Sequence, residues 1–181
     1  MTTIATQIRD AIFTRVSTLT GYTKFQREPV PNIAPADVPV VTVFILSENL
    51  TPDGDPNAGA PKFEAIATIA VSVLRGFSDP VTLDGQIDVD LDAIENLLLS
   101  DPTFVGWGPH VPVPFESVMG IRRQRIYHKD AEAYFIEARL EFQFLNRVYY
   151  PPNITTGLTE ITVAKPAAPT VLDLDITLPY P

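Results

Sequence analysis

Apolar residues near the start of the chain recur at three- and four-residue spacing. They are Ile4, Ile8, Ala11, Ile12, Val16 and Leu19. Because polar residues occupy the positions between them, this spacing predicts an amphipathic helix. Thr2 or Thr3 can cap its beginning, and Gly21 can end it. The following segment, Tyr22–Arg27, is a candidate edge strand.

Two later segments are dense in β-branched, aliphatic and aromatic residues. They are Val38–Leu46 and Phe63–Arg75, and in both of them apolar residues occupy positions of either parity. This pattern predicts two strands that are apolar on both faces. The residues between them, Ser47–Lys62, are rich in Gly, Pro, Asp and Asn and predict a long exposed loop.

A second helical pattern begins at Thr82 and stops at Ser100–Pro102. Its apolar positions are Ile87, Leu91, Ile94 and Leu98. Four aspartates lie in its first half, namely Asp84, Asp88, Asp90 and Asp92. Carboxylates there favour the positive end of a helix dipole. We prefer this interpretation to a calcium loop, because the central glycine and closing glutamate of such a loop are missing.

The segment Glu116–Tyr150 contains two strand patterns around Tyr127–Asp130. Strict alternation in the second one predicts an antiparallel hairpin with one buried face. Residues 151–181 are rich in Pro, Thr and Ala, and include one alternating run. Leu172, Leu174 and Ile176 belong to that run. We therefore expect a domain of residues 1–150, followed by an extended arm of residues 151–181.

Composition supports this division and limits the classes of function. Apart from Pro39, at the second position of Val38–Leu46, the 18 prolines lie between the predicted elements or in the arm. Of the 181 residues, 45% are hydrophobic, enough for a core. The net charge of -9 argues against general affinity for nucleic acid or anionic membranes. The absence of cysteine excludes disulfides and thiolate chemistry. Neither a signal peptide nor a membrane span is visible, so we expect a soluble protein made in the cytosol.

Candidate chemical groups are few. Neither His110 nor His128 has a second ligand-type residue at the spacing of a metal site. The serines lack a nucleophile-elbow motif. Asp53 and Asp55 could bind calcium weakly, but a turn explains them fully. We therefore expect no enzymatic activity, no catalytic residue, no cofactor and no metal.

Basic residues are concentrated in one short segment of this acidic chain. Arg122, Arg123, Arg125 and Lys129 are 4 of its 13 cationic residues. On a strand, Arg123 and Arg125 share one face while Arg122 lies on the other. Pairing with Glu132, Glu137 and Glu141 of the returning strand is favoured over nucleic-acid binding. A protein interface stays open as an alternative.

Together these elements predict an α+β fold, with a mainly antiparallel sheet of about four strands and two helices on one face. Strands that are apolar on both faces need a second cover. The C-terminal arm or a neighbouring copy of the chain is expected to supply it. We therefore expect self-assembly.

The order of the elements resembles the tail-terminator (tail-completion) proteins of tailed bacteriophages, over about residues 3–147. The segments that carry the resemblance are Ile8–Ile12, Val38–Val43, the long loop, Ala65–Leu74, Ile87–Leu99 with Asp101–Pro102, and Glu137–Phe142. The resemblance implies a non-enzymatic virion protein that forms a ring, usually a hexamer, at the head-proximal end of the tail. Such a ring is assembled in the host cytoplasm, caps the tail tube and ends its polymerisation.

The resemblance also implies partners: other copies of the chain, the tail tube protein and the head-tail connector protein. DNA would pass through without specific binding, since an acidic lumen repels phosphates, and no membrane is involved. Candidate interface residues are Asp53, Asp55, Arg122, Arg123, Arg125, Lys129, Leu172, Leu174 and Ile176. The loop 47–62 is the preferred contact with the tube. Alternatives are another head-to-tail joining ring, a tail-tube subunit, or a module that binds a small ligand or peptide.

Overall fold

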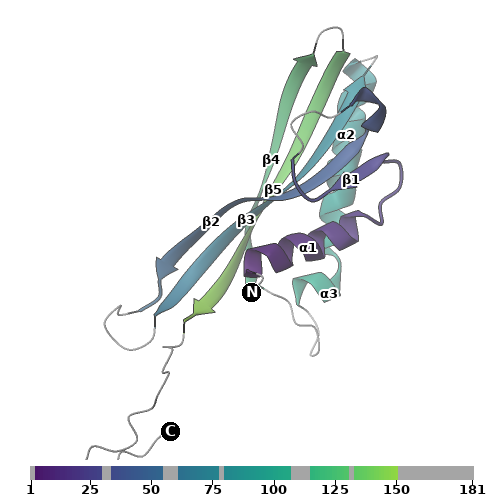
Figure 1. Cartoon of the computed structure of the whole chain (residues 1–181). Coiled ribbons are helices and arrows are strands. Elements are labelled where there is room, and N and C mark those ends of the chain that lie inside the picture. The colour runs from purple at the N-terminus through teal and green to yellow at the C-terminus, as the bar shows by residue number, and fades with distance from the viewer. Residues whose placement is uncertain are drawn as a thin grey trace, which may run out of the picture. The chain divides into compact units, whose positions relative to one another are not determined.

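Five strands and three α-helices make up the described part of the chain. In the computed structural model this part comprises residues 3–29, 34–54, 61–77, 80–106, 115–130 and 133–150. The strands form one sheet in the order β1-β2-β3-β5-β4 (Figure 1). They are β1 (Lys24–Gln26), β2 (Val40–Pro52), β3 (Lys62–Phe77), β4 (Ser117–Asp130) and β5 (Ala133–Tyr149). The predicted α+β class is confirmed.

The count of about four mainly antiparallel strands was only roughly right. The candidate edge strand forms as β1 and pairs in parallel with the start of β2, so the sheet has five strands and is mixed. The other pairs, β2–β3, β3–β5 and β5–β4, are antiparallel. β1 is only three residues long, and Phe25 packs it against the core. A single 3-10 turn, η1 (Pro35–Asp37), lies between β1 and β2.

Helices α1 (Ile4–Val16) and α2 (Pro80–Leu99) pack on the same face of the sheet (Figure 1). The hydroxyl of Thr3 accepts a hydrogen bond from the backbone N–H of Thr6 at 3.2 Å, so Thr3 is the cap. The helix ends at Val16, earlier than Gly21 suggested. A third, four-residue helix, α3 (Pro102–Val105), begins after Asp101.

One apolar core lies between this helix layer and the sheet. Ile8, Ile12 and Val16 of α1 are fully buried, as are Ile87, Ile94 and Leu98 of α2. The sheet contributes Val41 and Val43 from β2, Ala67–Val73 at alternate positions of β3, and Ile136–Phe144 at alternate positions of β5. Phe104 of α3 packs together with three further phenylalanines, Phe115, Phe142 and Phe144. Each buried aromatic or aliphatic side chain stabilises the fold by about 1.5–3 kcal/mol.

The predicted loop Ser47–Lys62 was largely wrong. β2 continues to Pro52 and β3 begins at Lys62, so the connection is limited to residues 53–61. Although its composition is typical of a loop, Ser47–Pro52 pairs residue by residue with Phe63–Thr68. The backbone hydrogen bonds of that ladder outweigh the weak strand preference of Glu48, Asn49 and Pro52.

The hairpin of β4 and β5 is confirmed, but the connection comes later than expected. Tyr127–Asp130 continues β4 and pairs with Ala133–Ile136, which leaves residues 131–132 to connect the two strands. Residues 1–149 group into one compact unit. The predicted arm, 151–181, lies outside the described residues, so the division at residue 150 stays a prediction.

Two bulges interrupt the ladders. In β2 the register with β3 shifts between Ile45 and Ser47, and in β4 the register with β5 shifts between Val118 and Gly120. Each bulge inserts one residue, Leu46 or Met119, and restarts the alternation of faces behind it. Both bulged strands have a long edge that no other described strand covers.

Candidate assembly surface

The basic segment of β4 lies against α2, which the sequence did not indicate. Arg123 donates from Nε and Nη2 to Glu95 at 2.7 Å, and from Nη2 to Asp92 at 2.7 Å. Hydrogen bonds to Glu95 and then to Asp92 raise the pKa of Arg123 further above its usual range. This fork joins the edge strand to the helix layer.

Arg125 repeats this contact nearer the start of the helix, where it pairs with Asp88. Arg122 projects on the opposite face, lies 3.9 Å from Glu141 and is 71% exposed. The expected cross-strand pairing is therefore found for Arg122 alone among the three arginines. Glu137 pairs instead with Arg139, its neighbour on the same strand. The side chain of Lys129 and the residue Glu132 lie outside the described part.

The aspartates of α2 also differ from the expectation. The helix begins at Pro80, its first turn contains no acidic residue, and Asp88 and Asp92 bind β4. Sequence reasoning missed this contact, because residues 28 to 37 positions apart give no local signal. The available signal was the coincidence of an acidic helix and a basic strand in one acidic chain.

A buried polar cluster joins α2 to β3 and to the segment before β1. Asp90 accepts hydrogen bonds from Arg75 at 2.5 and 2.9 Å and from the hydroxyl of Tyr22 at 2.9 Å. Burial, and then the charge of Asp90, raise the pKa of Tyr22, so this phenol stays protonated. The hydrogen bond to Asp90 likewise raises the pKa of Arg75. Because α2 is tied to β4 on one side and to β3 on the other, its position on the sheet is fixed.

The sheet face opposite the helices is not the apolar surface that we expected. Thr42, Thr68 and Ser72 occupy its middle and are buried, although no described helix covers them. Glu137 accepts hydrogen bonds from Ser72 at 2.8 Å and from Arg139 at 2.7 Å. The guanidinium of Arg139 also lies 5.5 Å from the ring centre of Phe44. Long side chains of β5 therefore cover the small side chains of β2 and β3.

Unpaired strand edges are the strongest surface feature of the described residues. β1 pairs with only Val40–Thr42, so from Val43 to Pro52 no described strand other than β3 lies beside β2. Among the described strands, β4 is the last one at the opposite edge and pairs with β5 alone. Large apolar side chains are exposed on both edge strands. They are Leu46 and Leu50 on β2, and Met119, Ile121 and Tyr127 on β4. Their exposure depends on strand order, which the local sequence pattern does not indicate.

The remaining predicted interface residues are divided between the described and undescribed parts. Asp53 follows β2 and lies 3.5 Å from Arg147 of β5. Asp55, Leu172, Leu174 and Ile176 lie outside the described residues. Their proposed roles therefore stay predictions.

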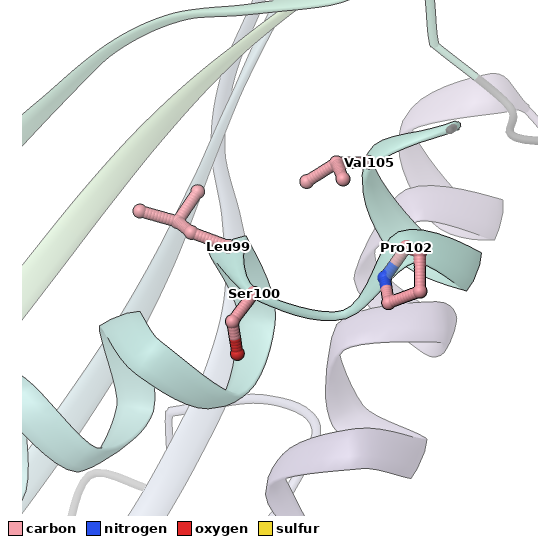
Figure 2. Close-up of a pocket in the computed structure, with 4 residues that line it drawn as sticks. All are labelled: Leu99, Ser100, Pro102 and Val105. Atoms are coloured by element: carbon pink, nitrogen blue, oxygen red, sulfur yellow. The ribbon is translucent and has the colours of Figure 1, made fainter.

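One pocket of about 330 Å³ lies where α2 meets α3 (Figure 2). Leu99, Ser100, Pro102 and Val105 line it. The hydroxyl of Ser100 donates to the backbone carbonyl of Asn96 in the preceding helical turn. The lining is thus mainly apolar. It also differs in place from the pocket that a ligand-binding module would form between the sheet and the arm.

Among the described residues, no three His, Cys, Asp or Glu side chains converge as metal ligands. No described helix has both the length and the apolar character needed to cross a membrane.

Comparison with known proteins gave distant structural likenesses. No family model and no curated protein sequence matches the chain. A chain in the virion of a native gene transfer agent particle is 14% identical, with a TM-score of 0.40, and the match covers 76% of this chain and 94% of that one. A chain in the sheath/tube terminator of an extracellular contractile injection system, PVC, in its extended state, is 10% identical with a TM-score of 0.35. That match covers 95% of this chain but 64% of the other. Likeness at this level assigns no function.

Proposed function

We propose that this protein is a structural subunit of a bacteriophage-type tail, where it forms a ring at the head-proximal end of the tail tube. The ring caps the tube, ends its polymerisation and provides the surface to which the head-tail connector joins. The observation that carries the proposal is a pair of long strand edges, on opposite sides of one sheet, that no other described strand covers and that both bear exposed apolar side chains. A contact that joins two different surfaces repeats from copy to copy, and it closes into a ring when the rotation permits.

The order of elements adds independent support. The tail-terminator resemblance rests on an N-terminal helix, a strand, a long loop, a second strand, a second helix and a closing strand. Apart from the loop, which is shortened to residues 53–61, the chain has these elements in that order. A hexamer is the proposed ring, because that is the usual state the resemblance implies. The proposed location is therefore the virion tail.

The charge distribution supports a channel through which DNA passes without binding. The chain has a net charge of -9, and Arg123 and Arg125 are engaged by carboxylates of α2. Phosphates would be repelled by an acidic lumen and would find few available cations. A ring whose lumen is lined by Arg122, Arg123, Arg125 and Lys129 would contradict this part of the proposal.

The test is assembly of the purified full-length chain. Light scattering combined with negative-stain microscopy is expected to show discrete rings of one symmetry. Added to polymerising tail tubes, these rings are expected to stop elongation, which is read as a shorter and narrower distribution of tube lengths. A chain that stays monomeric at micromolar concentration would contradict the ring. Continuous tubes made of this chain alone would identify a tube subunit instead.

A further inference from the structure

We infer that the outer edge of β2 in one copy pairs with β4 of the next copy, so that the sheets of neighbouring copies join into one continuous antiparallel sheet. In the register that we propose, Leu50 lies opposite Ile121, and Glu48 lies opposite Arg123. This inference rests on the proposed function, because it names the surfaces through which the subunits of the ring join.

The edges of β2 and β4 both offer backbone groups for further hydrogen bonds. β4 is 14 residues long, and β2 has no described neighbour on its outer side from Val43 to Pro52. An unpaired edge presents a row of N–H and C=O groups that can template another strand. Strand directions alternate from β2 through β3 and β5 to β4. A β4 placed beside the β2 of an identically oriented neighbour is therefore antiparallel to it.

The apolar side chains of the two edges project on the same side of the sheet. Leu50 pairs with Ala65, and Ile121 pairs with Phe142, and both partners are buried on the helix-covered side of the sheet. In a continuous sheet, side chains that project on the same side meet across the new ladder. Leu50 and Ile121 are 43% and 39% exposed in the single chain, so pairing would bury apolar surface on both copies.

The charges of the two edges also favour pairing. No lysine or arginine occurs from Glu28 to Pro61, so the β2 edge lacks the cationic residues that commonly block edge pairing. Glu48 is exposed on this edge and projects on the helix-covered side, because it pairs with Ala67. Arg123 projects on the same side of β4. A guanidinium has five N–H donors, so Arg123 can bind a further carboxylate beside Glu95 and Asp92.

The register is compatible with closure of a ring. Ile121 pairs with Phe142 of β5. Leu50 pairs with Ala65 of β3, which in turn pairs with Asn146 of β5. Placing Leu50 opposite Ile121 therefore displaces the next copy by four residues along the strands, the separation of Phe142 and Asn146. This displacement is roughly 13 Å over four strands that span roughly 19 Å, which tilts the strands by about 35°. Closed barrels have strand tilts of about 35–45°. The new ladder also ends near Val43, where β1 begins to occupy the β2 edge.

Disulfide trapping tests the pairing in the full-length chain, which has no cysteine of its own. The variant Leu50→Cys/Ile121→Cys is expected to give, on oxidation, a ladder of covalent multimers that ends at the ring size. The control Asn49→Cys/Ile121→Cys places its cysteines on opposite faces and is expected to stay largely uncrosslinked. A third variant, Ile121→Cys/Leu174→Cys, tests whether the C-terminal arm occupies the β4 edge instead.

The outcomes separate the pairing from the proposed function. The edge pairing is overturned, and the ring is left intact, if rings of Leu50→Cys/Ile121→Cys form without crosslinks. The same holds if crosslinks form instead in one of the other two double-cysteine variants. A chain that remains monomeric overturns both. Glu48→Arg gives a second readout, because it places two cations opposite each other. It is expected to raise the concentration for half-assembly by about tenfold or more, whereas Asn49→Arg, on the other face, is expected to change it less than about threefold.

Discussion

The two faces of the same sheet bury their central residues in different ways. On the helix-covered face, Ile69, Val71 and Leu140 are fully buried beneath α1 and α2. On the open face, small or hydroxyl-bearing side chains at Thr42, Ala70 and Ser72 are buried beneath longer ones. Apolar packing thus stabilises one face, and a layer of hydrogen bonds and ion pairs covers the other.

This difference changes where a partner is expected. We predicted a partner for the second face, because both strands looked apolar on both sides. Glu137, Arg139 and Phe44 already cover that face in the single chain. The exposed apolar residues lie instead on the edge strands. Self-assembly is therefore expected at the edges of the sheet and not on its open face.

The largest expected effect is on the helix-covered face. Leu140→Ala removes a fully buried side chain from the core and is expected to lower the free energy of unfolding by about 4 kcal/mol. Urea unfolding followed by circular dichroism measures it. A loss below about 1 kcal/mol would show that this face is less tightly packed than its burial indicates.

A slightly smaller effect is expected where the helix layer meets the sheet. Asp90→Asn removes the charge that faces Arg75 in a buried site, and is expected to cost about 3 kcal/mol of unfolding free energy. Asp88→Asn is the matched control on the exposed side of the same helix, and should cost less than about 1 kcal/mol. Equal losses in the two variants would contradict the assignment of Asp90 as the buried anchor of α2.

The open face should respond weakly to a change at the position next to Leu140. Arg139→Ala removes the ion pair with Glu137 and the contact with Phe44, and is expected to cost about 1 kcal/mol in the same unfolding assay. Arg139→Lys keeps the charge but not the forked geometry, and should recover part of the loss. If Arg139→Ala matched Leu140→Ala, the two faces would not differ in the way described.

The smallest effect concerns acid stability at the start of α3. Hydrogen bonds from Thr103 and Arg15 lower the pKa of Asp101 to about 2 from its usual 3.8. The folded state therefore binds this proton less readily than the unfolded state does. The resulting stabilisation, on the order of 1 kcal/mol, is complete above about pH 4 and is lost as the pH falls towards 2.

Two variants test this window. Asp101→Asn should flatten the decrease of unfolding free energy between pH 4 and pH 2. Thr103→Val removes the hydroxyl donor to Asp101 and should weaken the decrease only in part, because Arg15 remains. Unchanged slopes in both variants would show that Asp101 does not titrate in this range.

Local pattern was sufficient to predict most elements of the fold. The helical stripe at Ile8 and Ile12, the alternation in β5 and the hairpin all depend on neighbours within a few residues. The outer half of β2 was missed, because Ser47–Pro52 has the composition of a loop and is held as a strand by its pairing with β3. The exact strand order, and hence the unpaired edges, depends on contacts between segments far apart in the chain.

The candidate site was predicted less completely than the fold. The sequence indicated the basic segment of β4, but assigned two of its arginines to the wrong partners. Arg123 and Arg125 bind α2 because β4 lies at the sheet edge, where the helix can reach across. No periodicity contains that information. Asp90 was grouped with the other aspartates of the helix, although it lies on the buried side of α2.

The bulge at Leu46 divides β2 into two parts that follow different parities. Before it, the odd positions Val41 and Val43 face the helices, and behind it the even positions Glu48 and Leu50 do. The inserted residue thus acts like a frameshift within the strand. If the strand lost this irregularity at unchanged length, Glu48 and Leu50 would turn towards the open face. Deleting Leu46 would instead restore a single frame and keep both on the helix-covered side, because Ser47 already pairs with Thr68, the residue next to Ile69. The single inserted residue therefore decides which side chains of the outer β2 edge lie on the helix-covered side, while the core half of the strand keeps its pairing.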